Sequence, residues 1–208
     1  RRTSDERQHD HRVRALIALA EAHSGRSREA TLECARQVKV VAPLASDARL
    51  ASMAMIRAGI IELHFEGWSD EIADRCLEAW RDLPRHVSNE QRSLAIRLLF
   101  LHHARSAYAT AWSAGRKLLP LALASGDLSD CVYCYYVLAA AALHLGRWDD
   151  AKGFAVEGTA VCERTGSVRY AVTMRMLQAW IALEAQRYDE AQRLSVGARD
   201  AAHLALPV

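Results

Sequence analysis

The sequence predicts an all-α protein, and two observations support this prediction. The 208 residues contain 38 Ala but only 26 Val, Ile and Thr together, a composition that favours helices over strands. A short motif also recurs about every 40 residues, which is typical of a repeat architecture. We therefore expect a right-handed α-solenoid, in which about five antiparallel helix pairs stack and bury a continuous core.

The recurring motif is an aromatic residue or Ser, two further residues and Ala. Its closing alanines are Ala30, Ala111, Ala151 and Ala191, at spacings of 81, 40 and 40 residues. A fifth copy falls inside the long gap, at residues 67–72, with one extra residue in its turn. The predicted units are 12–46, 47–87, 88–128, 129–166 and 167–205. They form a single repeat domain over residues 12–208, preceded by a polar tail over residues 1–11.

Each unit is predicted to hold two helices joined by a short turn. The first helices are expected over residues 12–22, 49–64, 90–103, 130–145 and 169–185. The second helices are expected over residues 27–41, 70–82, 107–124, 149–163 and 189–203. Ser27, Asp47, Ser88 and either Ser129 or Asp130 suit N-cap positions. The residues expected to end helices are Pro43, Pro84, Gly126 and Gly166.

Two features predict how these helices pack. Twelve residues before the closing alanines stand Ala18, Leu99, Ala139 and Ala179, with Gly59 in the equivalent place. Small residues there allow close approach of the paired helices, and we expect the turn aromatics to fill the wedge at the end of each pair. The apolar run Cys131–Leu143 predicts a helix covered by its neighbours. Pro120, inside a second helix, should kink or shorten it.

Charge and cysteine content exclude several protein classes. The 27 Lys and Arg against 25 Asp and Glu leave a net charge of +2, which gives no electrostatic reason to expect a nucleic-acid or membrane partner. The thirteen-residue apolar run is too short to cross a bilayer as a helix. Five cysteines do not suggest a disulfide scaffold, so a reducing cytoplasm is the expected location. Without an initiator Met or a signal sequence, the chain is expected to be part of a longer protein.

The units resemble the tetratricopeptide repeat. The resemblance rests on small first-helix residues and on the aromatic-x-x-Ala turn, as in Gly146–Ala151 and Gln186–Ala191, and it covers about residues 12–203. The period of about 40 residues exceeds the usual 34. Longer units of this kind resemble the tetratricopeptide-like arrays of bacterial signalling regulators, notably the MalT-like sensor region of LuxR-type transcription activators. Similar arrays precede diguanylate cyclase domains.

This resemblance implies a non-catalytic sensor region of a larger cytoplasmic bacterial signalling or transcription regulator. Its partner, a protein, a peptide or a small-molecule effector, would bind in the concave groove, and its occupancy would act on the flanking domains of the parent chain. The alternative is a protein–protein scaffold or self-association module, for example preceding a diguanylate cyclase domain. A homodimer through the C-terminal unit is expected in that case.

The resemblance also selects candidate groove residues on the first helices, where aromatic and Met side chains would supply the contact area. Tyr133, Tyr136 and Trp180 are the foremost candidates. The others are Met53, Ile56, Ile60, Phe100 and Met176. For each, the alternative is packing against the adjoining unit.

Four histidines follow the same period near the ends of the first helices. They are His23, His64, His103 and His144, at spacings of 41, 39 and 41 residues. Stacked units would place them about 10 Å apart, one helix diameter. One interpretation is that the imidazoles bond to turn carbonyls at the helix ends. The other is that these histidines form an anion-contacting or pH-sensitive ladder along the groove edge, in which His103 and His144 are the candidate ligand-binding residues.

No catalytic motif accompanies these candidates. The sequence holds no nucleophile elbow, no phosphate-binding loop and no dinucleotide fingerprint, so we expect neither an enzyme nor a bound cofactor or metal. Cys131 and Cys134 are expected to be buried rather than to bind metal or exchange disulfides. Acidic pairs such as Asp149–Asp150 are expected to favour helix N-termini.

Overall fold

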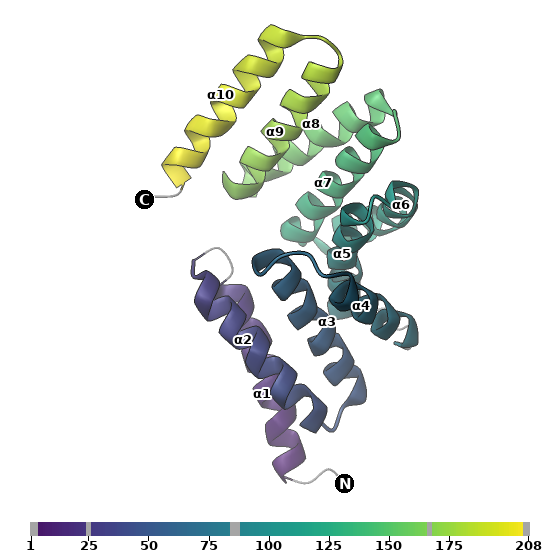
Figure 1. The fold of residues 1–208 in the computed structure, drawn as a ribbon, viewed down its shortest axis with the longest axis vertical. Coiled ribbons are helices and arrows are strands. Elements are labelled where there is room, and N and C mark those ends of the chain that lie inside the picture. Colours follow the sequence, from purple (N-terminus) through teal and green to yellow (C-terminus); the bar gives the residue numbers. More distant parts are fainter. Residues whose placement is uncertain (1–3, 24–25, 84–87, 166–167, 206–208) are drawn as a thin grey trace. The chain divides into compact units, whose positions relative to one another are not determined.

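The chain is all-helical in a computed structural model that describes residues 4–23, 26–83, 88–165 and 168–205 (Figure 1). These ranges contain ten α-helices, one short 3-10 helix and no strand, so the predicted fold class is confirmed. The elements are α1 (Ser4–His23), α2 (Arg28–Val41), η1 (Ala42–Leu44), α3 (Ala48–Phe65), α4 (Asp70–Asp82), α5 (Asn89–Ala104), α6 (Tyr108–Ser125), α7 (Leu128–His144), α8 (Trp148–Thr165), α9 (Val168–Glu184) and α10 (Tyr188–Ala205).

Every predicted helix except the first agrees with its observed bounds within two residues. The expected caps explain part of this agreement. The Ser27 hydroxyl accepts a hydrogen bond from the Ala30 N–H at 3.2 Å, and the Asp47 carboxylate accepts from two N–H groups at the start of α3. The exception is α7, which Asp127 caps rather than Ser129 or Asp130, because the Asp127 carboxylate accepts a hydrogen bond from the Asp130 N–H. The helix α2 ends at Val41, before Pro43. Pro84 and Gly166 lie outside the described residues.

The first helix begins at Ser4, well before the predicted start. Residues 4–11, which were expected to belong to a polar tail, are therefore part of this helix. Asp10 gives the physical reason, because it is buried and its carboxylate accepts hydrogen bonds from the Ser46 N–H (2.9 Å) and the Ser46 hydroxyl (2.8 Å). These partners lie 36 residues away, so no local pattern reveals them.

The helices form two compact units, Arg1–Leu94 and Ala95–Val208. Consecutive helices pack in chain order from α1 to α4 in the N-terminal unit and from α6 to α10 in the C-terminal unit. First helices of successive pairs also touch, α1 with α3 in the N-terminal unit and α7 with α9 in the C-terminal unit. Stacking in order is the arrangement that defines a helical repeat. The single domain over residues 12–208 stays a prediction.

Small residues on the first helices do lie at close helix contacts. In the N-terminal unit, a Cβ built on Gly59 of α3 would lie 2.5 Å from the Sγ atom of Cys76 of α4. In the C-terminal unit, Ala139 and Ala179 are buried. At Gly59 the sequence identified a close contact correctly, because even one added carbon would meet the facing helix. The expectation is wrong for Ala18 at the equivalent place of α1, because this residue is exposed.

The helix α7 forms the centre of the C-terminal unit. From Asp130 to Leu143, every residue except Tyr136 is buried, as predicted for the apolar run. Cys131 and Cys134 belong to this core. Burial, with smaller contributions from Asp130 and Cys131, raises the pKa of the Cys134 thiol to about 12, so this thiol stays protonated and unreactive near neutral pH.

Pro120 does not end α6, which continues to Ser125. The helix ends at Gly126, whose φ of 71° is left-handed. Proline removes one hydrogen bond to the carbonyl four residues earlier, that of Arg116. Arg116 and Pro120 are both exposed, so water can donate a hydrogen bond to this carbonyl and the helix tolerates the proline.

The turns of the C-terminal unit repeat one backbone conformation every 40 residues. Ser106, Gly146 and Gln186 have φ values of 57°, 71° and 59°. The N–H of the following residue returns to the carbonyl of His102, Ala142 and Ala182 at 2.8, 2.9 and 2.8 Å. This is the Schellman motif, which satisfies carbonyls at a helix end.

The aromatic residues after these turns do not fill a wedge, contrary to expectation. Trp148 is 45% exposed and Tyr188 is 62% exposed. Ala151 and Ala191, three residues further on, take the buried position instead. Only Tyr108 is half-buried.

None of the helices in the described ranges is both long enough and apolar enough to span a lipid bilayer.

Candidate binding surface

Five rings from four helices meet in the C-terminal unit. We call them the ring cluster, and they are His103 of α5, Tyr108 of α6, Tyr136 and His144 of α7, and Trp180 of α9. Residues His103, His144 and Trp180 lie in the last two turns of their helices. The 40-residue period therefore brings the ends of three first helices to the same place.

The rings are in direct contact. The His103 ring centroid lies 5.6 Å from that of Tyr108, 6.0 Å from that of Tyr136 and 6.0 Å from that of His144. Tyr108 stacks on His144 with centroids 4.1 Å apart and planes 10° from parallel. Trp180 meets His144 edge-on at 5.1 Å. Such stacked and edge-to-face pairs are favourable beyond the area that they bury.

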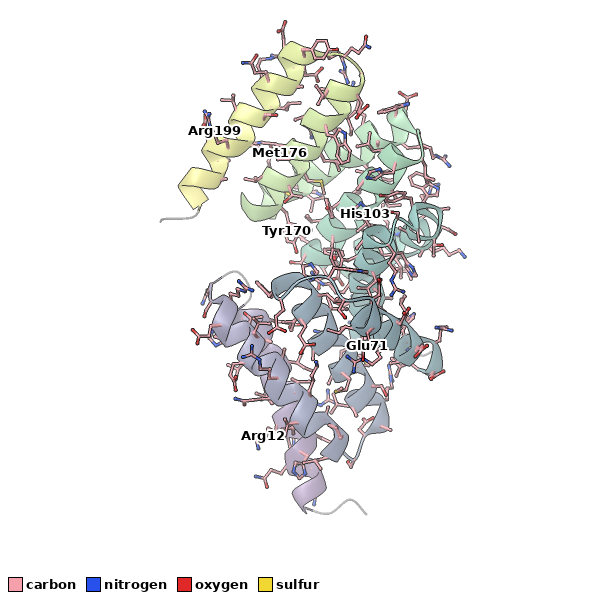
Figure 2. The ribbon with its side chains drawn as sticks, viewed as in Figure 1. Arg12, Glu71, His103, Tyr170, Met176 and Arg199 are labelled. Atoms are coloured by element: carbon pink, nitrogen blue, oxygen red, sulfur yellow. The ribbon has the colours of Figure 1, made fainter. Side chains whose placement is uncertain are left out.

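The cluster is buried at one end and exposed at the other. His103 and Tyr136 are half-buried, whereas His144 is exposed and Trp180 is 42% exposed. Met176, one turn before Trp180 on α9, is 50% exposed (Figure 2). The indole Nε1–H of Trp180 donates a hydrogen bond to Glu184 Oε1 at 3.0 Å, which fixes the ring. The exposed end thus presents a large oriented aromatic side chain beside a flexible thioether.

The two histidines have different environments. Burial, with a smaller effect of nearby His144, lowers the pKa of His103. Its Nε2 atom is buried and makes no hydrogen bond within the described part of the chain. Because a charged imidazole would lack a partner there, His103 is neutral near neutral pH. Burial likewise raises the pKa of Tyr136, so the inner part of the cluster is uncharged.

The structure brings together four of the predicted binding residues, namely Tyr136, Trp180, His103 and His144. Met176 is exposed beside them, and Phe100 is half-buried against the core. Tyr133 is placed differently. It is only 5% exposed, and its buried hydroxyl has no hydrogen-bond partner among the described residues, so it offers no surface to a partner.

The guanidinium of Arg97 occupies the space that a ligand would need at Tyr133. It lies 5.0 Å from the centre of the Tyr133 ring and 3.8 Å from the buried carboxylate of Asp130. Burial alone would lower the pKa of Arg97, but Tyr170, Asp130 and Tyr133 together raise it. This group therefore compensates a buried charge inside the helix stack.

The predicted groove residues of the N-terminal unit are core residues. Met53, Ile56 and Ile60 are 5%, 1% and 7% exposed. For these three residues the packing alternative describes the structure, because α3 is covered by its neighbours α1, α2 and α4.

Two expectations about rings need correction. His103 and His144 lie 6.0 Å apart rather than about 10 Å, because both side chains converge on Tyr108. Tyr108 was not among the predicted site residues. Its position in the repeat provided a signal. Tyr108 follows the turn of one helix pair and lies 36 residues before His144, which stands at the end of the next first helix. The turn-carbonyl interpretation fits His64, whose Nδ1 lies 3.1 Å from the Ile60 carbonyl oxygen.

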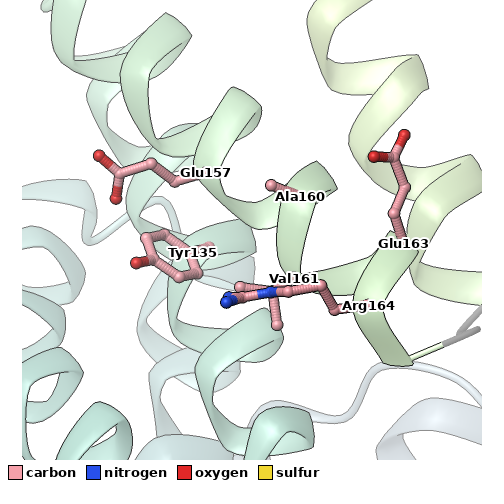
Figure 3. Close-up of a pocket in the computed structure, with 6 residues that line it drawn as sticks. All are labelled: Tyr135, Glu157, Ala160, Val161, Glu163 and Arg164. Carbon is pink, nitrogen blue, oxygen red and sulfur yellow. The ribbon is translucent and has the colours of Figure 1, made fainter.

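A separate hollow of about 670 Å³ lies between α7 and α8. Figure 3 shows the Tyr135 hydroxyl and the Arg164 guanidinium pointing into the same space. Burial, together with a hydrogen bond to the Glu157 carboxylate and the charge of that group, raises the pKa of Tyr135 to about 12. Two carboxylates, of Glu157 and Glu163, and the guanidinium of Arg164 line the hollow, which leaves a net charge of −1. In the part of the chain that the structure describes, no group of three or more His, Cys, Asp or Glu is placed to hold a metal ion.

The fold defines the class of protein, a helical repeat protein of tetratricopeptide-like architecture. No protein-family model and no curated protein matches the chain. Among solved structures, the chain is similar to one titled "Crystal Structure of Rap Protein Complexed with Competence and Sporulation Factor", with a TM-score of 0.69 and 11% identity over 91% of this chain. The chain spans about half of that protein, 54% of its length. At this identity the similarity establishes the fold alone.

Proposed function

We propose that this chain is a non-catalytic binding module and that a protein or peptide partner docks on the exposed end of the ring cluster. The observation that supports this most directly is the pair Trp180 and Met176, which are 42% and 50% exposed on adjacent turns of one helix. Large apolar side chains placed together on a surface are typical of interaction sites. Aromatic anchors supply most of the binding energy in many interfaces.

The ring cluster prepares this surface for binding. His144 and Trp180 meet in a T-shaped contact, Tyr108 stacks on His144, and Glu184 accepts a hydrogen bond from the indole N–H. A side chain whose orientation is already fixed loses little conformational entropy when a partner binds. Met176 complements it, because an unbranched thioether adapts to the shape of the partner.

The similarity to a helical repeat protein solved with Competence and Sporulation Factor supports a binding role for this fold. We place the module in a larger cytoplasmic bacterial signalling or transcription regulator, as its resemblance to MalT-like sensor arrays implies. In that setting, a partner would shift the regulator only as far as it prefers one arrangement of the chain over another.

Selection from a random peptide library on the immobilised chain tests the binding proposal. The affinity of the selected peptides is then measured for the wild type, for a Trp180→Ala, Met176→Ala double variant, and for Leu121→Ala. Leu121 of α6 is 48% exposed, so it controls for the general loss of surface apolar area. We expect the double variant to bind at least about tenfold more weakly, as for loss of a hot spot, while Leu121→Ala binds normally.

Equal affinity of the wild type and the double variant would show that the surface is wrongly assigned. An equal loss in Leu121→Ala would show that the binding is non-specific. Circular dichroism of each variant confirms that the helical content is unchanged.

A further inference from the structure

The exposed end of the ring cluster combines an aromatic face with a carboxylate. Trp180 is 42% exposed, and its Nε1–H donates to Glu184 Oε1 at 3.0 Å. Glu184 is itself exposed. A carboxylate that accepts one indole hydrogen bond still has lone pairs available for a cationic donor.

The basic residue of the same turn does not neutralise this carboxylate. Arg187 pairs with Glu190 at 2.7 Å, and Glu184 forms no ion pair within the described ranges of the chain. The segment 184–190 contains Glu184, Asp189 and Glu190 against Arg187 alone, which leaves a net charge of −2. Glu184 also ends α9, and the negative end of a helix dipole favours a cation.

Apolar surface flanks the aromatic face. Met176 and Leu183, four residues before and three residues after Trp180, are 50% and 51% exposed. Residues at these spacings are neighbours on a helix surface. They are suited to contact the methylene stem of a long cationic side chain, whose head would reach Trp180 and Glu184.

We propose that this end of the ring cluster, defined by Met176, Trp180, Leu183 and Glu184, is a subsite for an arginine side chain of the partner. Arginine fits better than lysine because its planar guanidinium stacks on an aromatic face and donates two parallel hydrogen bonds to one carboxylate. The inference rests on the proposed function and names the chemistry of the partner that the surface selects.

The test uses N-acetylarginine amide as the probe and the full chain labelled with ¹⁵N. The Trp180 indole N–H resonance reports directly on the site, because this group donates to Glu184. We expect a saturable shift of this resonance at concentrations on the order of 10–100 mM, as for a single exposed cation–π contact with an ion pair. N-acetylcitrulline amide, which has the same shape without the charge, should bind at least about fivefold more weakly.

Two variants separate the charge from the structure of the site. Glu184→Gln keeps an acceptor for the indole N–H but removes the carboxylate charge, and it should lose at least about fivefold in arginine affinity. Asp149→Asn is the control, because it removes an exposed carboxylate at a distant place, the first turn of α8. This control should bind the arginine probe as the wild type does.

Equal binding of the citrulline probe, unchanged binding by Glu184→Gln, or no saturable shift with arginine would each overturn the inference. Its failure is distinguishable from that of the proposed function. If selected peptides depend on Trp180 but contain no arginine and ignore Glu184, the surface stands and the arginine subsite is wrong. If selected peptides ignore Trp180, the surface itself is wrong.

Discussion

Replacing Gly158 with Ala is expected to destabilise the C-terminal unit where α8 packs against α7 and α9. A Cβ built on Gly158 would lie 2.9 Å from the Cβ of Tyr135 and 2.6 Å from the Cε of Met174. The Met174 methyl group can move aside, but the Tyr135 Cβ is fixed to the backbone of α7. The substitution therefore forces the helices apart, and overpacking of this kind costs about 1–3 kcal/mol.

Gly153→Ala is the matched control on the same helix, because a Cβ there meets nothing within 4 Å. Both substitutions gain about 1 kcal/mol in helix propensity. The difference between the two variants therefore isolates packing and should be about 1–3 kcal/mol in unfolding free energy.

Urea titration followed by circular dichroism measures this difference. Thermal unfolding should place the midpoint of Gly158→Ala about 3–9 °C below that of Gly153→Ala for a chain of this size. If Gly158→Ala is as stable as Gly153→Ala, then Gly158 does not lie at a close helix contact. The packing that positions His144 and Trp180 would then need to be revised.

Two further predictions concern buried polar groups. Burial and His144 lower the pKa of His103 below its ordinary value of 6.5. Near and below this pH, the unfolded chain therefore binds more protons at His103 than the folded chain does. The contribution of His103 to folding stability is complete above about pH 6.5 and is lost as the pH falls below it. Urea titration should show a smaller decrease in unfolding free energy between pH 7 and 5 for His103→Gln than for the wild type. Part of the decrease should remain, because burial and Arg105 also lower the pKa of His102. An equal decrease in the variant and the wild type would contradict the assignment. Asp10→Ala should cost about 2–3 kcal/mol of unfolding free energy, because it leaves the Ser46 N–H and hydroxyl without their buried acceptor. Asp10→Asn, which keeps one acceptor oxygen, should cost less, and equal losses in the two variants would argue against this hydrogen-bonding role.

Much of the fold could be predicted because its signals are local. The N-caps Ser27 and Asp47 and the left-handed turn residue Gly146 satisfy or redirect backbone groups within a few residues, and such signals are visible in a single segment. The start of α1 was missed for the opposite reason, since Asp10 is held by Ser46.

The candidate site was predictable only in part. Tyr133 and Tyr136 stand one turn apart on α7, yet Tyr133 is 5% exposed and packs under Arg97, whereas Tyr136 reaches the ring cluster. Helical periodicity places both on neighbouring positions of the helix surface. It does not reveal which of them the adjacent helices cover.

By itself, the sequence determined the helical class, the 40-residue spacing and the close contact at Gly59, because composition, local capping and side-chain size are properties of short segments. The tertiary structure decided which rings meet. Tyr108, His144 and Trp180 lie about one repeat apart in the chain and come into contact only when successive helix pairs stack. The exposure of Trp180 and the access of a cation to Glu184 likewise depend on which residues the stacked helices bring near. Packing between helices decides these neighbours, and the sequence of a single helix does not reveal them.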